Sequence, residues 1–254
     1  MAKISARIFA KSLGFSTGIE VIIPHNPYNH TPVEKVLYLL HGLSDDCTAW
    51  TRRTTIELFA EKYNYAVIMP EVQCSFYANM AYGSNYFTYV SEELPKICED
   101  IFRINHTREK TFVAGLSMGG YGAVRCGLAK PDFFGACAGF SGALDPQARS
   151  KDLVEKHGFE RQLIGILGQD KIFPEDANLF KLAEKTALLP EGQKPRVLIT
   201  CGDKDYLLED NERFNEHMKK LPIDYKYMIW EGEHNWKFWE ESLTPMFKFF
   251  EKEE

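Results

Sequence analysis

The segment Gly115-Leu116-Ser117-Met118-Gly119-Gly120 carries a clear signal for covalent chemistry. It directly follows an apolar run at residues 111–114 and directly precedes a segment of helical periodicity. In a G-x-S-x-G motif between strand and helix, the glycines permit a sharp turn that lifts the serine Oγ out at the strand end. A glycine-rich turn that only packs a helix against a strand would share these letters, so the setting matters. We therefore predict that Ser117 is a nucleophile.

A nucleophilic serine needs a general base, and His234 is the candidate. It follows a strand-like run at residues 225–229 and precedes the last helical pattern, so its loop can bring an imidazole over the turn of Ser117. An acid that orients the imidazole would complete the set. In this strand-turn-helix setting the expected chain order is nucleophile, acid, histidine.

Two aspartates compete for the role of the acid, because Asp203 and Asp205 both follow the apolar run at residues 197–200. The first residues after a strand usually form the turn, and Asp203 suits a turn or a helix N-cap. The spacing therefore favours Asp205, with Asp203 as the alternative.

Another strand end could supply hydrogen-bond donors for an oxyanion. Residues 39–43, Leu-Leu-His-Gly-Leu, close an apolar run and open a loop. At such a turn the backbone N–H of Leu43 can point toward Ser117, where it would act together with the N–H of Met118. We interpret His41 itself as structural.

The walls of a substrate pocket are marked less clearly. Residues 144–195 are polar, carry weak helical patterns and show no convincing strand, so we predict a cap over the sheet, called here the cap segment. Trp50, Tyr82 and Trp236 are candidate pocket residues, with ordinary core packing as the alternative.

A sheet must position these loops. Near-continuous apolar runs alternate with helical patterns, which predicts an α/β fold with a mostly parallel sheet and helices on both faces. Ligands bind at the carboxyl ends of such strands. An antiparallel N-terminal hairpin is expected at residues 6–13 and 19–24, joined through 14–18. The remaining strands are predicted at 36–40, 66–69, 111–114, 136–140, 197–200 and 225–229, and the helices at 84–102, 121–129, 207–221 and 235–250.

Composition narrows the class of protein. The 254 residues contain no linker or repeat, so residues 1–254 are predicted to form a single domain. The net charge of −6 and the absence of a Lys/Arg run argue against a nucleic-acid partner. Six cysteines without a C-x-x-C pair, and no H-E-x-x-H or Cys/His quartet, argue against a disulfide scaffold and a metal site.

The N-terminal residues 1–13 mix Lys3, Arg7 and Lys11 into apolar residues, unlike a signal peptide or a membrane span. We therefore expect a cytoplasmic protein that acts on a small molecule, with no membrane partner, metal or cofactor. The sequence leaves the oligomeric state open, and a homo-oligomer is compatible with it.

Four motifs resemble the esterase D branch of the α/β-hydrolases, and more closely the bacterial tributyrin esterases. They are LLHGLSDD (39–46), GLSMGGYGA (115–123), CGDKDYLLEDN (201–211) and EGEHNWKFW (231–239). The resemblance covers nearly the full chain and implies an α/β-hydrolase fold. It implies Ser117 as nucleophile, His234 as base and Asp205 as acid, with the N–H groups of Leu43 and Met118 as oxyanion hole. The cap segment is the part least like the family.

This resemblance implies a serine carboxylesterase that hydrolyses short-chain acyl esters through an acyl-enzyme. The alternatives are an S-formylglutathione hydrolase-type thioesterase and a feruloyl or acetyl esterase acting on plant carbohydrate esters. A non-catalytic binding module on a hydrolase scaffold is a more remote alternative.

Overall fold

An eight-stranded sheet forms the centre of the structure, a computed structural model that describes residues 1–25, 28 and 32–253. The strand order is β1-β2-β4-β3-β5-β6-β7-β8. Neighbours from β4 to β8 are parallel, whereas β2 is antiparallel to both β1 and β4. The strands are β1 (Ala2–Ala10), β2 (Phe15–Ile23), β3 (Lys35–Leu40), β4 (Tyr65–Pro70), β5 (Thr111–Leu116), β6 (Ala136–Phe140), β7 (Arg196–Gly202) and β8 (Tyr225–Trp230).

The predicted parallel sheet with an antiparallel N-terminal hairpin is confirmed, and the predicted strand at residues 136–140 coincides with β6. The hairpin differs in position, because β1 begins at Ala2 and the turn lies at residues 11–14. The first half of β1 is an exposed edge whose side chains leave little hydrophobic pattern. Its backbone nevertheless pairs with β2 from Ala2 onward, and this pairing sets the register.

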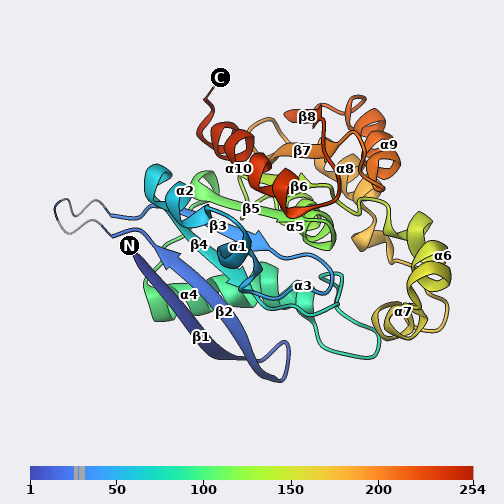
Figure 1. The fold of residues 1–254 in the computed structure, drawn as a ribbon, viewed down its shortest axis with the longest axis horizontal. Helices are drawn as coiled ribbons and strands as arrows, with labels where there is room; N and C mark the ends of the chain where they lie inside the picture. Colours follow the sequence, from blue (N-terminus) through green and yellow to red (C-terminus); the bar gives the residue numbers. More distant parts are fainter. Residues whose placement is uncertain (26–27, 29–31, 254) are drawn as a thin grey trace.

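Helices cover both faces of the sheet (Figure 1). Apolar residues of α1, α2 and α10 pack on one face, and those of η1, α4, α5, α8 and α9 pack on the other. The helices are α1 (Ala49–Arg53), α2 (Ile56–Tyr63), α3 (Tyr86–Thr88), α4 (Leu94–Phe102), α5 (Met118–Ala129), α6 (Pro146–His157), α7 (Glu160–Leu167), α8 (Leu179–Ala187), α9 (Leu208–Met218) and α10 (Trp236–Glu251), with the π-helical turn η1 (Tyr89–Glu93) and the 3-10 turns η2 (Arg108–Lys110) and η3 (Glu175–Ala177).

The predicted helix at residues 84–102 is divided into α3, η1 and α4. Pro95 lies in the first turn of α4, where a missing N–H costs little. Its ring would clash with the carbonyl four residues earlier in a continuous α-helix, and the wider π-helical turn precedes it. The proline therefore marks a restart of the helix.

The cap segment contains α6, α7, η3 and α8, and no strand is found among its described residues. α8 packs into the main core, with Leu182 and Ala183 buried against α5 and α9. Figure 1 shows α6 and α7, in yellow-green, outside the layers formed by the sheet and its flanking helices. Of these two helices, α6 lines the cavity beside Ser117, whereas none of the described residues of α7 does.

Candidate active site

Ser117 lies in the sharp turn between the end of β5 and the start of α5. Its φ of 53° and ψ of −116° are a conformation that non-glycine residues rarely adopt, so the surrounding structure must hold it. The Ser117 N–H donates to the Phe140 carbonyl (2.9 Å), and the Ser117 carbonyl accepts from the N–H of Ala143 (3.1 Å). These bonds to the end of β6 and the loop after it fix the turn. The residue is 9% exposed and lines a cavity.

Gly119 makes this turn sterically feasible, because α5 begins almost in contact with the end of β3. A Cβ atom on Gly119 would lie 2.4 Å from the carbonyl oxygen of Leu40 and 2.6 Å from that of His41. Both atoms belong to the backbone and cannot rotate away. The second glycine of the motif is therefore required by the close approach of two elements.

We expect Gly119→Ala to lose about 1–3 kcal/mol of stability, the usual cost of overpacking a core. Chemical denaturation measures this loss. Gly165→Ala in α7 is the control, since its new Cβ would meet only Met80 Cε at 3.7 Å, an ordinary contact. Alanine's better helix propensity should make that variant neutral or about 1 kcal/mol more stable. Equal stability of Gly119→Ala and the wild type would contradict the close approach.

His234 lies between Ser117 and Asp205, on the loop from β8 to α10. Its Nε2 is 3.0 Å from Ser117 Oγ, and its Nδ1 is 3.0 Å from each carboxylate oxygen of Asp205. A carboxylate beside Nδ1 favours a proton on that nitrogen, so Nε2 accepts the hydrogen bond from the Ser117 hydroxyl. The fold thus brings together the three side chains that the sequence predicted as nucleophile, base and acid.

The two candidate acids occupy different positions. The Asp205 side chain is fully enclosed, and its Oδ1 also accepts from the N–H of Leu207 (2.8 Å). Asp203 instead accepts at its Oδ1 from the N–H of Gly232 (3.0 Å) and ties down the loop that carries His234. Asp205 is therefore the carboxylate that orients the imidazole, and Asp203 has the turn role that suited it.

Leu43 and Met118, the predicted oxyanion donors, both line the cavity with Ser117. The loop of Leu43 is held by the buried side chain of His41, whose Nε2 accepts from the N–H of Val72 (3.1 Å). Its Nδ1 therefore carries the proton and donates to the Gly42 carbonyl (2.8 Å). His41 has the structural role that the sequence indicated. The alignment of the two N–H groups on an oxyanion stays a prediction.

A cavity of about 650 Å³ opens beside Ser117. Its wall is mostly apolar with a few polar groups, which is typical of a site for a small organic ligand. α6 and Phe159, which follows it after Gly158, form one side of this cavity. The lining residues are Gly42, Leu43, Ser44, Asp45, Cys74, Phe76, Leu116, Ser117, Met118, Ala143, Pro146, Arg149, Asp152, Leu153, Phe159, Tyr206, Leu207, His234 and Trp239.

The three aromatic residues that were predicted as pocket walls, Trp50, Tyr82 and Trp236, lie outside the cavity wall, so this prediction is wrong. Trp50 is fully buried, its Nε1–H donates to the Leu40 carbonyl (3.1 Å), and its ring packs edge-on against Trp236 at 5.3 Å between centroids. Tyr82 is 65% exposed, and its N–H bonds to Gly165. None of the three is among the described residues that line the cavity. Trp50 and Trp236 instead pack α1 against α10.

Two aromatic residues that the sequence reasoning missed contact the imidazole. The ring of Tyr206 lies 4.4 Å from that of His234, and the ring of Trp239 lies 5.0 Å from it, edge-on. Tyr206 is 63% exposed, but the protein around its inner face partly desolvates it, which raises the pKa of Tyr206, and the negative charge of Asp205 raises it further. Tyr206 directly follows Asp205, and Trp239 is one helical turn past Trp236, so adjacency was the available signal.

The cavity wall also carries ionisable side chains besides His234. Burial raises the pKa of Asp45, which lies on the loop that follows Leu43. Arg149 and Asp152 come from α6, with Arg149 Nη1 3.6 Å from Asp152 Oδ2.

Among the described residues no group of three His, Cys, Asp or Glu side chains could hold a metal ion. Within the same ranges, no helix combines the length and apolarity needed to cross a membrane.

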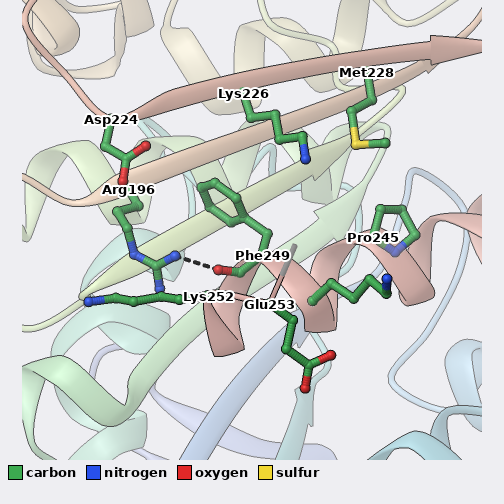
Figure 2. Close-up of a pocket in the computed structure, with 9 residues that line it drawn as sticks. Arg196, Asp224, Lys226, Met228, Pro245, Phe249, Lys252 and Glu253 are labelled. Carbon is green, nitrogen blue, oxygen red and sulfur yellow. Dashed lines mark hydrogen bonds between the residues drawn. The ribbon is translucent and has the colours of Figure 1, made fainter.

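A second groove, of about 600 Å³, lies at the end of α10 (Figure 2). Arg196 donates to the carbonyls of Phe249 and Phe250, the latter at 3.0 Å, and thereby satisfies carbonyls of the last helical turn. The residues that line the groove, all in the described part of the chain, include no serine, cysteine or histidine. Its chemistry is that of a helix C-terminus, and the cavity at Ser117 is the candidate active site.

Comparisons with known proteins agree with this geometry. The model of a family described as "Putative esterase" matches residues 10–250. An acetyl esterase of Caldicellulosiruptor saccharolyticus is 31% identical over 229 residues, covering 86% of this chain and 84% of that protein. The structure of the fluorophosphonate-binding serine hydrolase F of Staphylococcus aureus has a TM-score of 0.86 at 32% identity, with 98% of each chain covered. An S-formylglutathione hydrolase of the same organism has a TM-score of 0.82 at 30% identity, again with 98% of each chain covered.

Proposed function

The chain belongs to this esterase family, and from that membership we propose that this serine esterase hydrolyses short-chain acyl esters through Ser117, His234 and Asp205. The family described as esterases, the acetyl esterase relative and the serine hydrolase of similar structure support carboxylic ester hydrolysis on an α/β-hydrolase fold. The further steps are the assignment of the catalytic residues and the choice of acyl group.

One observation carries the assignment of the residues. An unbroken chain of contacts runs from Ser117 Oγ through both nitrogens of His234 to the Asp205 carboxylate, with 3.0 Å at each step. The serine hydroxyl at the start of this chain lies in the wall of a largely apolar cavity. A hydroxyl, an imidazole and an enclosed carboxylate in this order are the parts needed for nucleophilic catalysis.

The proposed reaction has two halves. Ser117 Oγ attacks the ester carbonyl while His234 Nε2 takes its proton, and the tetrahedral oxyanion is held by the N–H groups of Leu43 and Met118. The imidazolium then protonates the departing alcohol, which leaves an acyl-enzyme. Water, deprotonated by His234, hydrolyses that ester and restores Ser117. Asp205 fixes the imidazole tautomer and stabilises its cation throughout.

The cavity supports a small acyl group. About 650 Å³ accommodates a small ligand, and Leu153 and Phe159 provide apolar surface from the cap segment. Kinetics with tributyrin and with p-nitrophenyl esters that range from acetate and butyrate to long acyl chains test the acyl preference. A kcat/KM that rises steadily up to long-chain esters would contradict it.

A thioesterase on the same catalytic residues is the second candidate, because an S-formylglutathione hydrolase of known structure is 30% identical over nearly the whole chain. Feruloyl and acetyl esters of plant carbohydrates form a third substrate class. S-formylglutathione and methyl ferulate, assayed beside the p-nitrophenyl esters, separate these classes. A rate increase on addition of alcohols would reveal acyl transfer, and failure to label with a fluorophosphonate would favour a binding module.

The cap role of residues 144–195 is tested by narrowing the cavity. We expect Leu153→Trp to lower kcat/KM for p-nitrophenyl butyrate at least about tenfold more than for p-nitrophenyl acetate, because each methylene excluded from an apolar pocket costs about 1–3 kcal/mol. Leu188→Trp is the matched control, since Leu188 lies in the same segment but is 87% exposed and outside the cavity wall. Equal losses of kcat/KM on both esters would show that α6 does not line the acyl site.

We also propose a cytoplasmic location. All six cysteines are free, and four of them are buried. Free thiols persist in a reducing compartment. Fractionation of cells that produce the natural protein tests this, and activity recovered mainly outside the cytoplasm would contradict it.

A further inference from the structure

α6 reaches the loop of Asp205 with one side chain, Arg149. Its Nε lies 3.1 and 2.9 Å from the two carboxylate oxygens of Asp210, and its Nη2 donates to the carbonyl of Tyr206 (2.9 Å). Arg149 therefore joins the cap segment to the residue that directly follows the proposed acid. No step of the mechanism above uses this contact.

The peptide group that Arg149 binds also holds the acid. The carbonyl of Tyr206 accepts from Arg149, and the N–H of the same peptide, that of Leu207, donates to Asp205 Oδ1 (2.8 Å). Asp205 in turn contacts His234. Because a donor at one end of a peptide group polarises and orients the N–H at the other end, these hydrogen bonds act in series.

Asp210 fixes the direction of the Arg149 guanidinium. This carboxylate is completely buried, and burial raises its pKa while the hydrogen bond from Arg149 opposes that rise. Arg213 of α9 binds the same carboxylate (2.8 Å), and its other charged contacts are Asp145 and Glu209. Two arginines thus neutralise Asp210. Of these two, Arg149 is the one that bonds to the peptide beside Asp205.

Resting on the catalytic residues proposed above, we propose that Arg149 is a positioning residue that orients Asp205, and through it His234, by way of the Tyr206–Leu207 peptide. The docked position of α6 is then a condition for full activity. The cap segment contributes to catalysis by holding the acid as well as by lining the cavity.

The test compares Arg149→Met with Arg213→Met, because each removes one of the two cations on Asp210. We expect Arg149→Met to lower kcat for p-nitrophenyl acetate about 10- to 100-fold, with KM changed less than about threefold, since a small misplacement of a catalytic group costs up to about 100-fold. Arg213→Met should keep kcat within about threefold of the wild type. The downfield proton NMR signal of the His234 Nδ1–H should move or broaden only in Arg149→Met.

Arg149→Lys tests the proposal even if Arg149→Met fails to fold. It keeps the positive charge beside Asp210, but an ammonium lacks the planar fork that serves a carboxylate and a carbonyl together. We expect it to fold, to lose kcat and to show the altered Nδ1–H signal. A wild-type kcat and signal in Arg149→Lys would overturn the proposal.

Other outcomes are equally decisive. Equal losses in Arg149→Met and Arg213→Met would show that both residues only stabilise the fold, and a raised KM with unchanged kcat would make Arg149 a substrate contact. Ser117→Ala, assayed in parallel, separates the claims. Turnover retained in Ser117→Ala overturns the proposed function. If Ser117→Ala is inactive but Arg149→Met and Arg213→Met lose the same amount of kcat, only the positioning role of Arg149 is overturned.

Discussion

We expect Ser117→Ala to lower kcat for p-nitrophenyl butyrate by about 10⁴-fold or more, because loss of a catalytic serine removes the covalent route and leaves only binding and oxyanion stabilisation. Steady-state kinetics measure the loss, and a fluorophosphonate probe should label the wild type alone. The loss of one hydroxyl from a residue that is 9% exposed should leave the unfolding midpoint nearly unchanged.

Ser141→Ala is the matched control for this experiment. Ser141 is a fully buried serine just after β6, and its hydroxyl has no hydrogen-bond partner in the described part of the chain. The same chemical change there should leave kcat within a few-fold of the wild type. Near-wild-type turnover in Ser117→Ala, or equal losses in both variants, would refute Ser117 as the nucleophile.

We expect Asp205→Asn to lower kcat by about 10³–10⁴-fold, because an amide beside Nδ1 no longer selects the tautomer that presents Nε2 to Ser117. It also removes the charge that stabilises the imidazolium. The effect should fall on kcat, and kinetics on p-nitrophenyl acetate and butyrate should show it equally, since Asp205 contacts His234 and Leu207 and is outside the cavity wall.

Asp203→Asn provides the comparison, since it makes the same change two residues earlier. Its amide oxygen can still accept from the N–H of Gly232, the bond that Asp203 makes in the structure. We expect a loss of no more than a few-fold. A larger loss in Asp203→Asn than in Asp205→Asn would reverse the assignment of the acid.

The inner parallel strands β3 to β7 could be predicted because they are buried on both faces and therefore read as continuous apolar runs, whereas the edge strand β8 is only partly buried. β6 coincides with its prediction, whereas β1 begins earlier because its first residues are an exposed edge held by backbone pairing with β2. The helix at residues 84–102 shows the same limit. Its apolar period continues past Pro95, but the backbone needs a π-helical turn to accommodate the proline.

The sequence by itself determined the strand-turn-helix position of Ser117, the order in the chain of its aspartate and histidine partners, and the loop that carries His234. Each is encoded within a few consecutive residues, where a strand end, a glycine turn and a reactive side chain are neighbours in the chain. Trp236 and Trp239 mark the boundary of this information. Both lie on α10, and only the packing of that helix against Trp50 decides which ring turns toward the imidazole.

The tertiary structure alone decided the residues that meet across elements. It distinguished Asp205 from Asp203, because Asp205 contacts the His234 imidazole at 3.0 Å whereas Asp203 accepts from the Gly232 N–H of the same loop, and it placed Arg149 of α6 on the carbonyl of Tyr206. The physical reason is that these contacts join segments that are tens of residues apart. Their geometry depends on how helices pack on the sheet, which local sequence patterns do not specify.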